Sequence, residues 1–184
     1  MRISRRLNLI VPIERDDGST MYVHSTPVTR EVFEQFFIVI SKTFSDMHEL
    51  GIGSRMAALM LRKVARDLKV VEDVENGLMA EIRRMSNAVV PTAGGWETMP
   101  LDDALSRKLL DGEDAKEVES AITFFTLTSS VMTRREMEVI NEKDGHLAGF
   151  KLESLNSTEF QRSLPTSMQA ANSGVTVKPL SVPS

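Results

Sequence analysis

The 184-residue chain combines a hydrophobic content of 41% with a formal net charge of -4, so it can form one domain of ordinary size around a core. Because it contains no cysteine, disulfides, thiolate metal sites and cysteine nucleophiles are excluded, and we expect a reducing compartment. The negative net charge argues against a nucleic-acid-binding domain as a whole, since phosphate contacts require a positive field.

The N-terminal segment predicts a β-hairpin over about residues 6–24. Two extended stretches, Arg6–Ile13 and Ser19–His24, are separated by an Asp-Asp-Gly sequence. An Asp-Gly pair favours a tight hairpin turn, because both residues accept positive φ. An isolated hairpin is only marginally stable in water, so we expect this one to pack on the first helix or to pair with another chain.

Neither a signal peptide nor a membrane span is predicted. The apolar run Leu7–Ile13 is interrupted by Asn8 and Pro12, and charged residues follow it rather than a small-residue cleavage site. No other apolar run approaches the roughly 20 residues that a membrane-spanning helix needs. We therefore expect a soluble protein without a membrane partner.

The stretch from Thr26 to Gly51 predicts a long helix around which the core forms. Thr26 can cap its start, Pro27 suits its first position, and Gly51 suits a left-handed end. We assign to the core five side chains at helical spacing: Phe33, Phe36, Phe37, Ile40 and Phe44. Three positions that flank this face are candidates for contact with another chain: Val32, Val39 and Met47.

Two further helices are expected, at about residues 55–69 and 72–85. Met56 and Met60, on the apolar side of the first of these, are candidate partner contacts, because methionine side chains adapt to different surfaces. Gly77 lies inside the other helix and weakens it by roughly 1 kcal/mol relative to alanine.

Basic residues on these two helices leave another interpretation open. Five arginines could contact phosphates in a helix-turn-helix-like unit: Arg55, Arg62, Arg66, Arg83 and Arg84. The helix that would read the bases carries acidic residues that would repel DNA: Glu72, Asp73, Glu75 and Glu81. We therefore prefer a basic face that pairs with acidic helices of a neighbouring copy.

The rest of the chain is predicted to be less regular. Residues 87–100, NAVVPTAGGWETMP, contain prolines and glycines that favour a long loop, which Trp96 would pin to a groove. A short helix should follow Pro100, and a long helix should run from Glu113 to about Ile140. From residue 141 onward the composition predicts an irregular tail or linker, in which Phe160 could dock on a partner.

Together these expectations define a mainly α fold. It would be a bundle of about five helices with an N-terminal β-hairpin and a flexible C-terminal tail. Residues 1–140 would form the helical domain, and residues 141–184 would form the tail.

No residue pattern indicates a reaction. The three histidines, His24, His48 and His146, lack zinc-ligand spacing, and the acidic pairs fall in turns and first helical turns, where carboxylates are favoured without catalysis. The sequence contains no nucleophile-elbow motif, and its Gly-Gly pair lacks the context of a phosphate-binding loop. We therefore expect a non-enzymatic protein without a metal or another cofactor.

Three stretches of the sequence resemble the tail assembly chaperones of long-tailed bacteriophages of the lambda and HK97 type. They are LNLIVPIERDDGSTMYVHSTPVTREVFEQFF, NAVVPTAGGWETMPLDDAL and STEFQRSLPTS. The resemblance covers Leu7 to about Ser167 and rests on the whole pattern rather than on a catalytic signature.

The resemblance implies a small, largely helical homo-oligomeric protein that coats the long hydrophobic tape measure protein in the host cytoplasm, before tail tube subunits polymerise. Many such proteins also occur as a frameshifted long form, whose added domain recruits the tail tube protein. Two alternatives remain open: a structural tail or connector component of the virion, and the DNA-binding regulator built on the five arginines.

Overall fold

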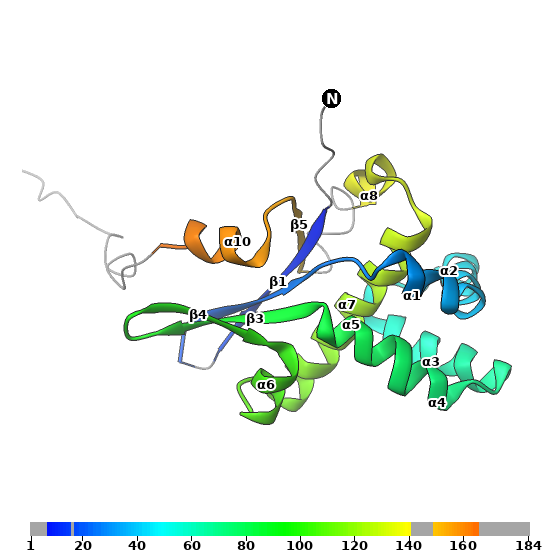
Figure 1. Cartoon of the computed structure of the whole chain (residues 1–184), viewed down its shortest axis with the longest axis horizontal. Helices are drawn as coiled ribbons and strands as arrows, with labels where there is room; N and C mark the ends of the chain where they lie inside the picture. Colours follow the sequence, from blue (N-terminus) through cyan, green and yellow to red (C-terminus); the bar gives the residue numbers. More distant parts are fainter. Residues whose placement is uncertain (1–6, 16, 141–148, 166–184) are drawn as a thin grey trace, which may run out of the picture.

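The computed structural model describes residues 7–15, 17–140 and 149–165. The elements of the first half are β1 (Asn8–Glu14), β2 (Thr20–Ser25), α1 (Arg30–Gln35), α2 (Phe37–Leu50), η1 (Ser54–Met56), α3 (Ala57–Leu68), α4 (Val71–Asp73), the π-helical η2 (Val74–Met79) and α5 (Ala80–Arg84). The elements of the second half are β3 (Ser86–Thr92), β4 (Gly95–Pro100), α6 (Leu101–Ser106), α7 (Gly112–Val131), α8 (Arg134–Ile140), β5 (Lys151–Glu153) and α10 (Ser157–Ser163). Figure 1 shows a twisted sheet with α6 and α10 on opposite sides of it.

The architecture is α+β, so the expected mainly α bundle is wrong. Five strands form one antiparallel sheet in the order β4-β3-β2-β1-β5. The predicted N-terminal hairpin is confirmed as β1 and β2, in which Val11 lies opposite Val23. In the turn between them, Gly18 has a φ of 76°, a left-handed conformation that glycine adopts without strain.

The segment expected to be a long loop forms a second hairpin, β3 and β4. Pro91 pairs with Trp96 of β4, but it lies beyond Ser86–Val89, the part of β3 that pairs with β2, so its missing N–H removes no bond to β2. Pro100 ends the edge strand β4 and leads directly into α6. Both prolines therefore lie where a sheet tolerates them.

Part of the expected tail also has regular structure. β5 pairs with β1, with Leu152 opposite Leu9, and Phe150 is buried with its ring centroid 6.3 Å from that of Phe124 in α7. α10 begins with a capping box, in which Asn156 and Glu159 each accept a hydrogen bond from the other's backbone N–H. The other tail residues, 141–148 and 166–184, lie outside the described residues.

The predicted first helix is divided by a bend into α1 and α2. It starts later than expected, because the side chain of Thr29 rather than Thr26 accepts the capping hydrogen bond from a backbone N–H. The bend lies at Phe36, whose φ of -107° and ψ of 18° leave the helical range. Gly51 ends α2 in the left-handed conformation, as predicted.

The core lies between the inner face of the sheet and the helices, and α7 is its central helix. α7 contacts α2, α3, α5 and β1, and the Asp111 side chain caps its start by accepting hydrogen bonds from two backbone N–H groups at 2.8 Å. The predicted helix from Glu113 to Ile140 is interrupted after Val131, and α8 begins at Arg134. Buried side chains on the inner face of the sheet include Leu9, Val11, Met21, Val23 and Ala88.

The helix expected at residues 72–85 is confirmed, and it contains a widened π-helical turn at η2. Gly77 lies in this turn, and the ring of Phe36 occupies the space beside it. A Cβ added at Gly77 would lie 2.6 Å from Cζ of Phe36. The glycine therefore allows α1 and α2 to approach η2 closely at the bend.

Candidate partner-binding surfaces

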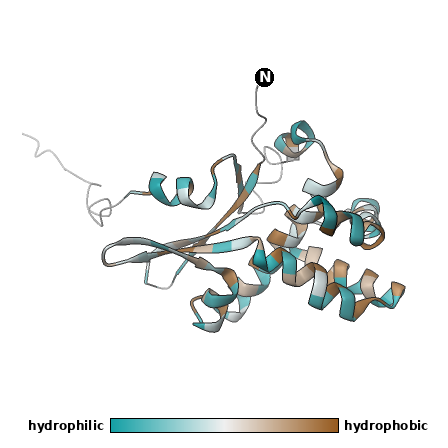
Figure 2. Cartoon of the chain, in the orientation of Figure 1, coloured by the Kyte–Doolittle hydropathy of each residue, from teal (hydrophilic) through white to brown (hydrophobic). Residues whose placement is uncertain are grey.

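An apolar groove of about 680 Å³ lies at the bend between α1 and α2, beside the connection from α3 to α4. Its lining residues are Glu34, Gln35, Phe36, Phe37, Ile38, Val39, Leu68, Val70 and Asp73. Phe37 is 53% exposed, Ile38 is 69% exposed and Leu68 is 37% exposed, so large apolar side chains face solvent here. Figure 2 shows hydrophobic residues, in brown, along the ribbons of α2 and of the neighbouring α3 and α4.

The bend is what turns this apolar surface outward. Phe36 is buried beside Gly77, and the rings of Phe33 and Phe37 meet edge to face with centroids 5.7 Å apart. On the other wall, Lys69 ends α3 in a left-handed conformation with a φ of 59°, which directs the chain into Val70 and α4. The groove is therefore held by contacts between elements rather than by a mobile loop.

The charged residues that line the groove are both acidic. Glu34 comes from α1 and Asp73 from α4, so each wall supplies one carboxylate. Arg30 binds Glu34 with an N–O distance of 2.7 Å, but both side chains are well exposed and the pair is weak in water. The groove suits an apolar ligand that carries positive charge beside its apolar face.

The structure places the predicted contact residues of the first three helices mostly in the interior. Val39 and Met47 are each 4% exposed and Met60 is 8% exposed, so these three belong to the core of this chain. Val32 is partly buried against the same core, and Met56 is 47% exposed at the start of the α3 region. Conversely, Phe37, which was assigned to the core, lies at the surface.

The other two predicted contact residues, Trp96 and Phe160, are brought together on the outer face of the sheet. The ring of Tyr22 lies between them, with its centroid 5.7 Å from Trp96 and 5.3 Å from Phe160. The indole N–H of Trp96 donates a hydrogen bond of 3.0 Å to the carbonyl of Pro165. These aromatic side chains therefore hold α10 against the sheet of the same chain.

A buried histidine, which sequence reasoning assigned only to a strand end, lies beneath this aromatic group. His24 is 0% exposed, and its Nε2 lies 2.9 Å from the carbonyl oxygen of Leu155. Burial lowers the pKa of His24 below its ordinary value of 6.5. The alternation of β2 places His24 on the same face as Tyr22, which is the one sequence signal that could have identified it.

The arginines of the DNA-binding interpretation are engaged by carboxylates of this chain. Arg62 is bonded to Glu75 at 2.7 Å and to both oxygens of Glu119 at 2.9 and 2.8 Å. Hydrogen bonds to Glu119 and Glu75 raise the pKa of Arg62, so its charge is fixed. Three further pairs are Arg83 with Asp102, Arg84 with Glu81 and Arg55 with Glu117.

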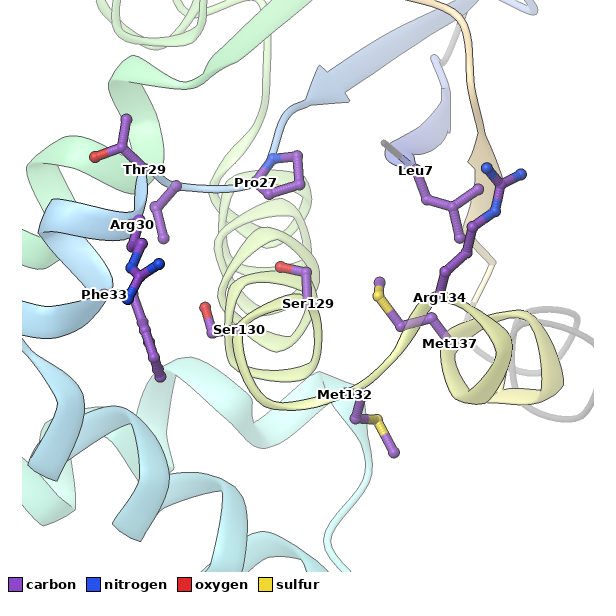
Figure 3. Close-up of a pocket in the computed structure, with 11 residues that line it drawn as sticks. Leu7, Pro27, Thr29, Arg30, Phe33, Ser129, Ser130, Met132, Arg134 and Met137 are labelled. Carbon is purple, nitrogen blue, oxygen red and sulfur yellow. The ribbon is translucent and has the colours of Figure 1, made fainter. Parts of the chain in front are cut away.

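A second pocket, of about 330 Å³, lies between the start of α1, the end of α7 and α8 (Figure 3). Two arginines line it, but Arg30 is bound to Glu34 and Arg134 is bound to Glu138 at 2.9 Å. The hydroxyl of Ser129 donates to a backbone carbonyl of α7. None of the lining residues is a histidine or carboxylate, so they cannot form a general acid and base pair.

Within the described residues, no group of three or more histidine and carboxylate side chains is arranged to hold a metal ion. None of the described helices combines the length and hydrophobicity that crossing a membrane requires. Comparison with known proteins adds no relative, because no family model, curated protein or solved structure matches the chain.

Proposed function

We propose that this protein is a non-enzymatic tail assembly chaperone of a long-tailed bacteriophage, which binds the tape measure protein before the tail tube polymerises. The exposed apolar groove at the bend between α1 and α2 carries the proposal in the structure. The resemblance of three sequence stretches to such chaperones supports it independently.

The occupant of the groove is an amphipathic helix of the tape measure protein. Phe37, Ile38 and Leu68 offer apolar anchors to such a helix, which would lay its apolar face into the groove. Glu34 and Asp73 favour basic residues beside that face, because opposite charges fix the register of docking. A protein that must bind many successive segments needs such a shared pattern rather than one exact sequence.

The proposal places the chain in the host cytoplasm as a homo-oligomer. A frameshifted long form would recruit tail tube subunits through an added domain. The internal pairing of the arginines favours this function over DNA binding, because it leaves little of their charge for phosphates.

Co-expression with the tape measure protein, followed by size-exclusion chromatography, tests the proposal. We expect the wild-type chain to keep the tape measure protein soluble and to elute with it. The double variant Phe37→Ser/Ile38→Ser should lose this activity while its unfolding by urea stays unchanged, because both side chains are exposed. Leu59→Ser is the matched control, since Leu59 is 55% exposed on α3 and does not line the groove.

Two outcomes would contradict the proposal. A tape measure protein that is equally insoluble with and without the chain would remove the chaperone function. If the double variant and the Leu59→Ser control bind alike, the groove is not the binding surface. Mass spectrometry of purified virions separates a chaperone, which should be absent, from a structural tail component, which should be present.

A further inference from the structure

We propose that residues 154–165, which we call the α10 strap, are a separable cover over an apolar surface of the sheet, and that protonation of His24 releases them. This inference does not depend on the proposed function. It rests on one buried histidine, one backbone carbonyl and the small set of contacts that hold α10.

Two side chains of the sheet hold the carbonyl of Leu155, where the chain leaves β5 and approaches α10. Nδ2 of Asn8 donates to this carbonyl at 2.7 Å, and Nε2 of His24 lies 2.9 Å from it. A carbonyl oxygen only accepts hydrogen bonds, so Nε2 of the neutral ring carries the proton. The other ring nitrogen, Nδ1, is then an acceptor.

Nδ1 of His24 has no hydrogen-bond partner, and it is the one buried side-chain nitrogen or oxygen in this condition among the described residues. Protonation would place a second N–H and a full charge at this position. The neighbours across the strands are Ile10 and Asn87, which are uncharged, and the ring of Phe160 lies above, with centroids 6.2 Å apart. A buried charge without a partner is costly, so protonation favours opening of the site.

One ionisable group opposes this cost. Glu153 of β5 favours the charged form of His24, but burial outweighs it, so that the pKa of His24 stays below 6.5. Lys151 also binds Glu153, with an N–O distance of 2.6 Å. β1 and β3 oppose the ring with uncharged residues.

The strap can leave without opening the main core. Phe160 packs with Ile10 and Val89 in a small cluster that is separate from the main core. Polar contacts add to it: Gln161 bonds the Thr98 hydroxyl at 2.8 Å and the carbonyl of Trp96 at 2.5 Å. In contrast, Phe150 belongs to the main core, so β5 stays in place when α10 leaves.

The direction of the pH dependence follows from proton binding. The closed state binds fewer protons than the open state, because the pKa of His24 is lower when it is buried. Closure is therefore complete above about pH 6.5 and weakens as the pH falls. For one proton, the closing equilibrium constant changes by about tenfold per pH unit between the two pKa values. Opening uncovers an apolar surface that includes Ile10, Tyr22, Val89 and Trp96.

Hydrogen exchange of the full-length chain between about pH 8 and pH 5 tests the inference. We expect protection factors in α10, such as that of the Phe160 amide, to fall by up to about tenfold per pH unit below about pH 6.5. Those of α7 should stay constant. The fluorescence of Trp96, the single tryptophan, should change over the same range, because its indole bonds the strap.

Two variants assign the effect to His24. His24→Gln can still donate to the Leu155 carbonyl but does not titrate, so α10 protection should become independent of pH. His48→Gln is the matched control, because His48 is exposed on α2, and it should behave as the wild type does. NMR titration of the His24 ring in the wild-type chain should give the same midpoint as strap opening, which covers the case that His24→Gln does not fold.

Three results would overturn the inference. The first is a loss of protection in α7 together with α10, because the strap would then not be separable. The second is an unchanged pH dependence in His24→Gln. The third is a His24 titration in the wild type whose midpoint differs from that of α10 opening.

Discussion

At the scale of single residues, Gly77 shows that helix propensity and packing can oppose each other. Alanine at this position would gain about 1 kcal/mol of helix propensity. Its Cβ would, however, lie 2.6 Å from the buried Phe36 ring, and overpacking of this kind costs about 1–3 kcal/mol. Packing should therefore win.

We predict that Gly77→Ala lowers the free energy of unfolding by about 1 kcal/mol, the difference between these opposing effects. Urea unfolding followed by circular dichroism measures the change. Gly112→Ala is the control, because Gly112 is also helical but has open space around its Cβ position, and this variant should be neutral or stabilised. A Gly77→Ala protein as stable as the wild type would show that the Phe36 ring can move aside.

The same contact explains why the candidate site was only partly predictable. Periodicity alone assigned Phe37 to the core and Val39 to the surface, because it treated residues 26–51 as one straight helix. The bend at Phe36 changes which side chains face inward, and the space that receives this ring is provided by Gly77 in a distant segment. No local pattern contains that information.

At the scale of elements, α10 depends strongly on its cap because it is short. Asn156 accepts a hydrogen bond of 2.9 Å from the Glu159 N–H, and Glu159 bonds the Asn156 N–H at 3.1 Å. Loss of an N-cap side chain typically costs about 1 kcal/mol. This cost should fall on α10 rather than on the whole fold.

We predict that Asn156→Ala lowers hydrogen-exchange protection in α10 by about fivefold, the equivalent of about 1 kcal/mol, and leaves α7 unchanged. Asn156→Ser is the matched control, since serine also caps helices. Equal loss of protection in α7 would contradict the prediction, because α10 would then open only with the whole domain.

Elements with strong local signals were predicted from the sequence, and those defined by distant partners were not. The first hairpin has an Asp-Gly turn, and the helices at 55–69 and 72–85 have clear periodicity. β3 and β4 were missed because Pro91 and Pro100 normally exclude strands, although here one lies beyond the β2 pairing and the other at a strand end. β5 has only three residues, and its pairing with β1 depends on tertiary structure.

At the scale of the whole molecule, charge is balanced by internal pairs. Arg62 and Arg83 both approach Glu119 of α7, at 2.8 and 3.8 Å, and thereby connect α3 and α5 to the central helix. These side chains are about a quarter to a third exposed, so the pairs are partly shielded from solvent. The arginines consequently act within the fold.

We predict that the full-length chain causes no mobility shift of duplex DNA, even at low salt, because its net charge is -4 and its arginines are paired with carboxylates. Titration of labelled DNA with the chain in a gel measures this. A shift that weakens steeply with added salt would contradict the prediction and support the helix-turn-helix interpretation.

The pairing of β1 with β5 also has a consequence for the order of folding during synthesis. β1 leaves the ribosome early, whereas its edge partner, which places Leu152 opposite Leu9, is translated much later. Until then, this edge of β1 carries unpaired backbone groups, which can recruit strands of other chains. A nascent chain that stops before residue 151 would keep that edge open, so release of the finished sheet depends on translation reaching β5.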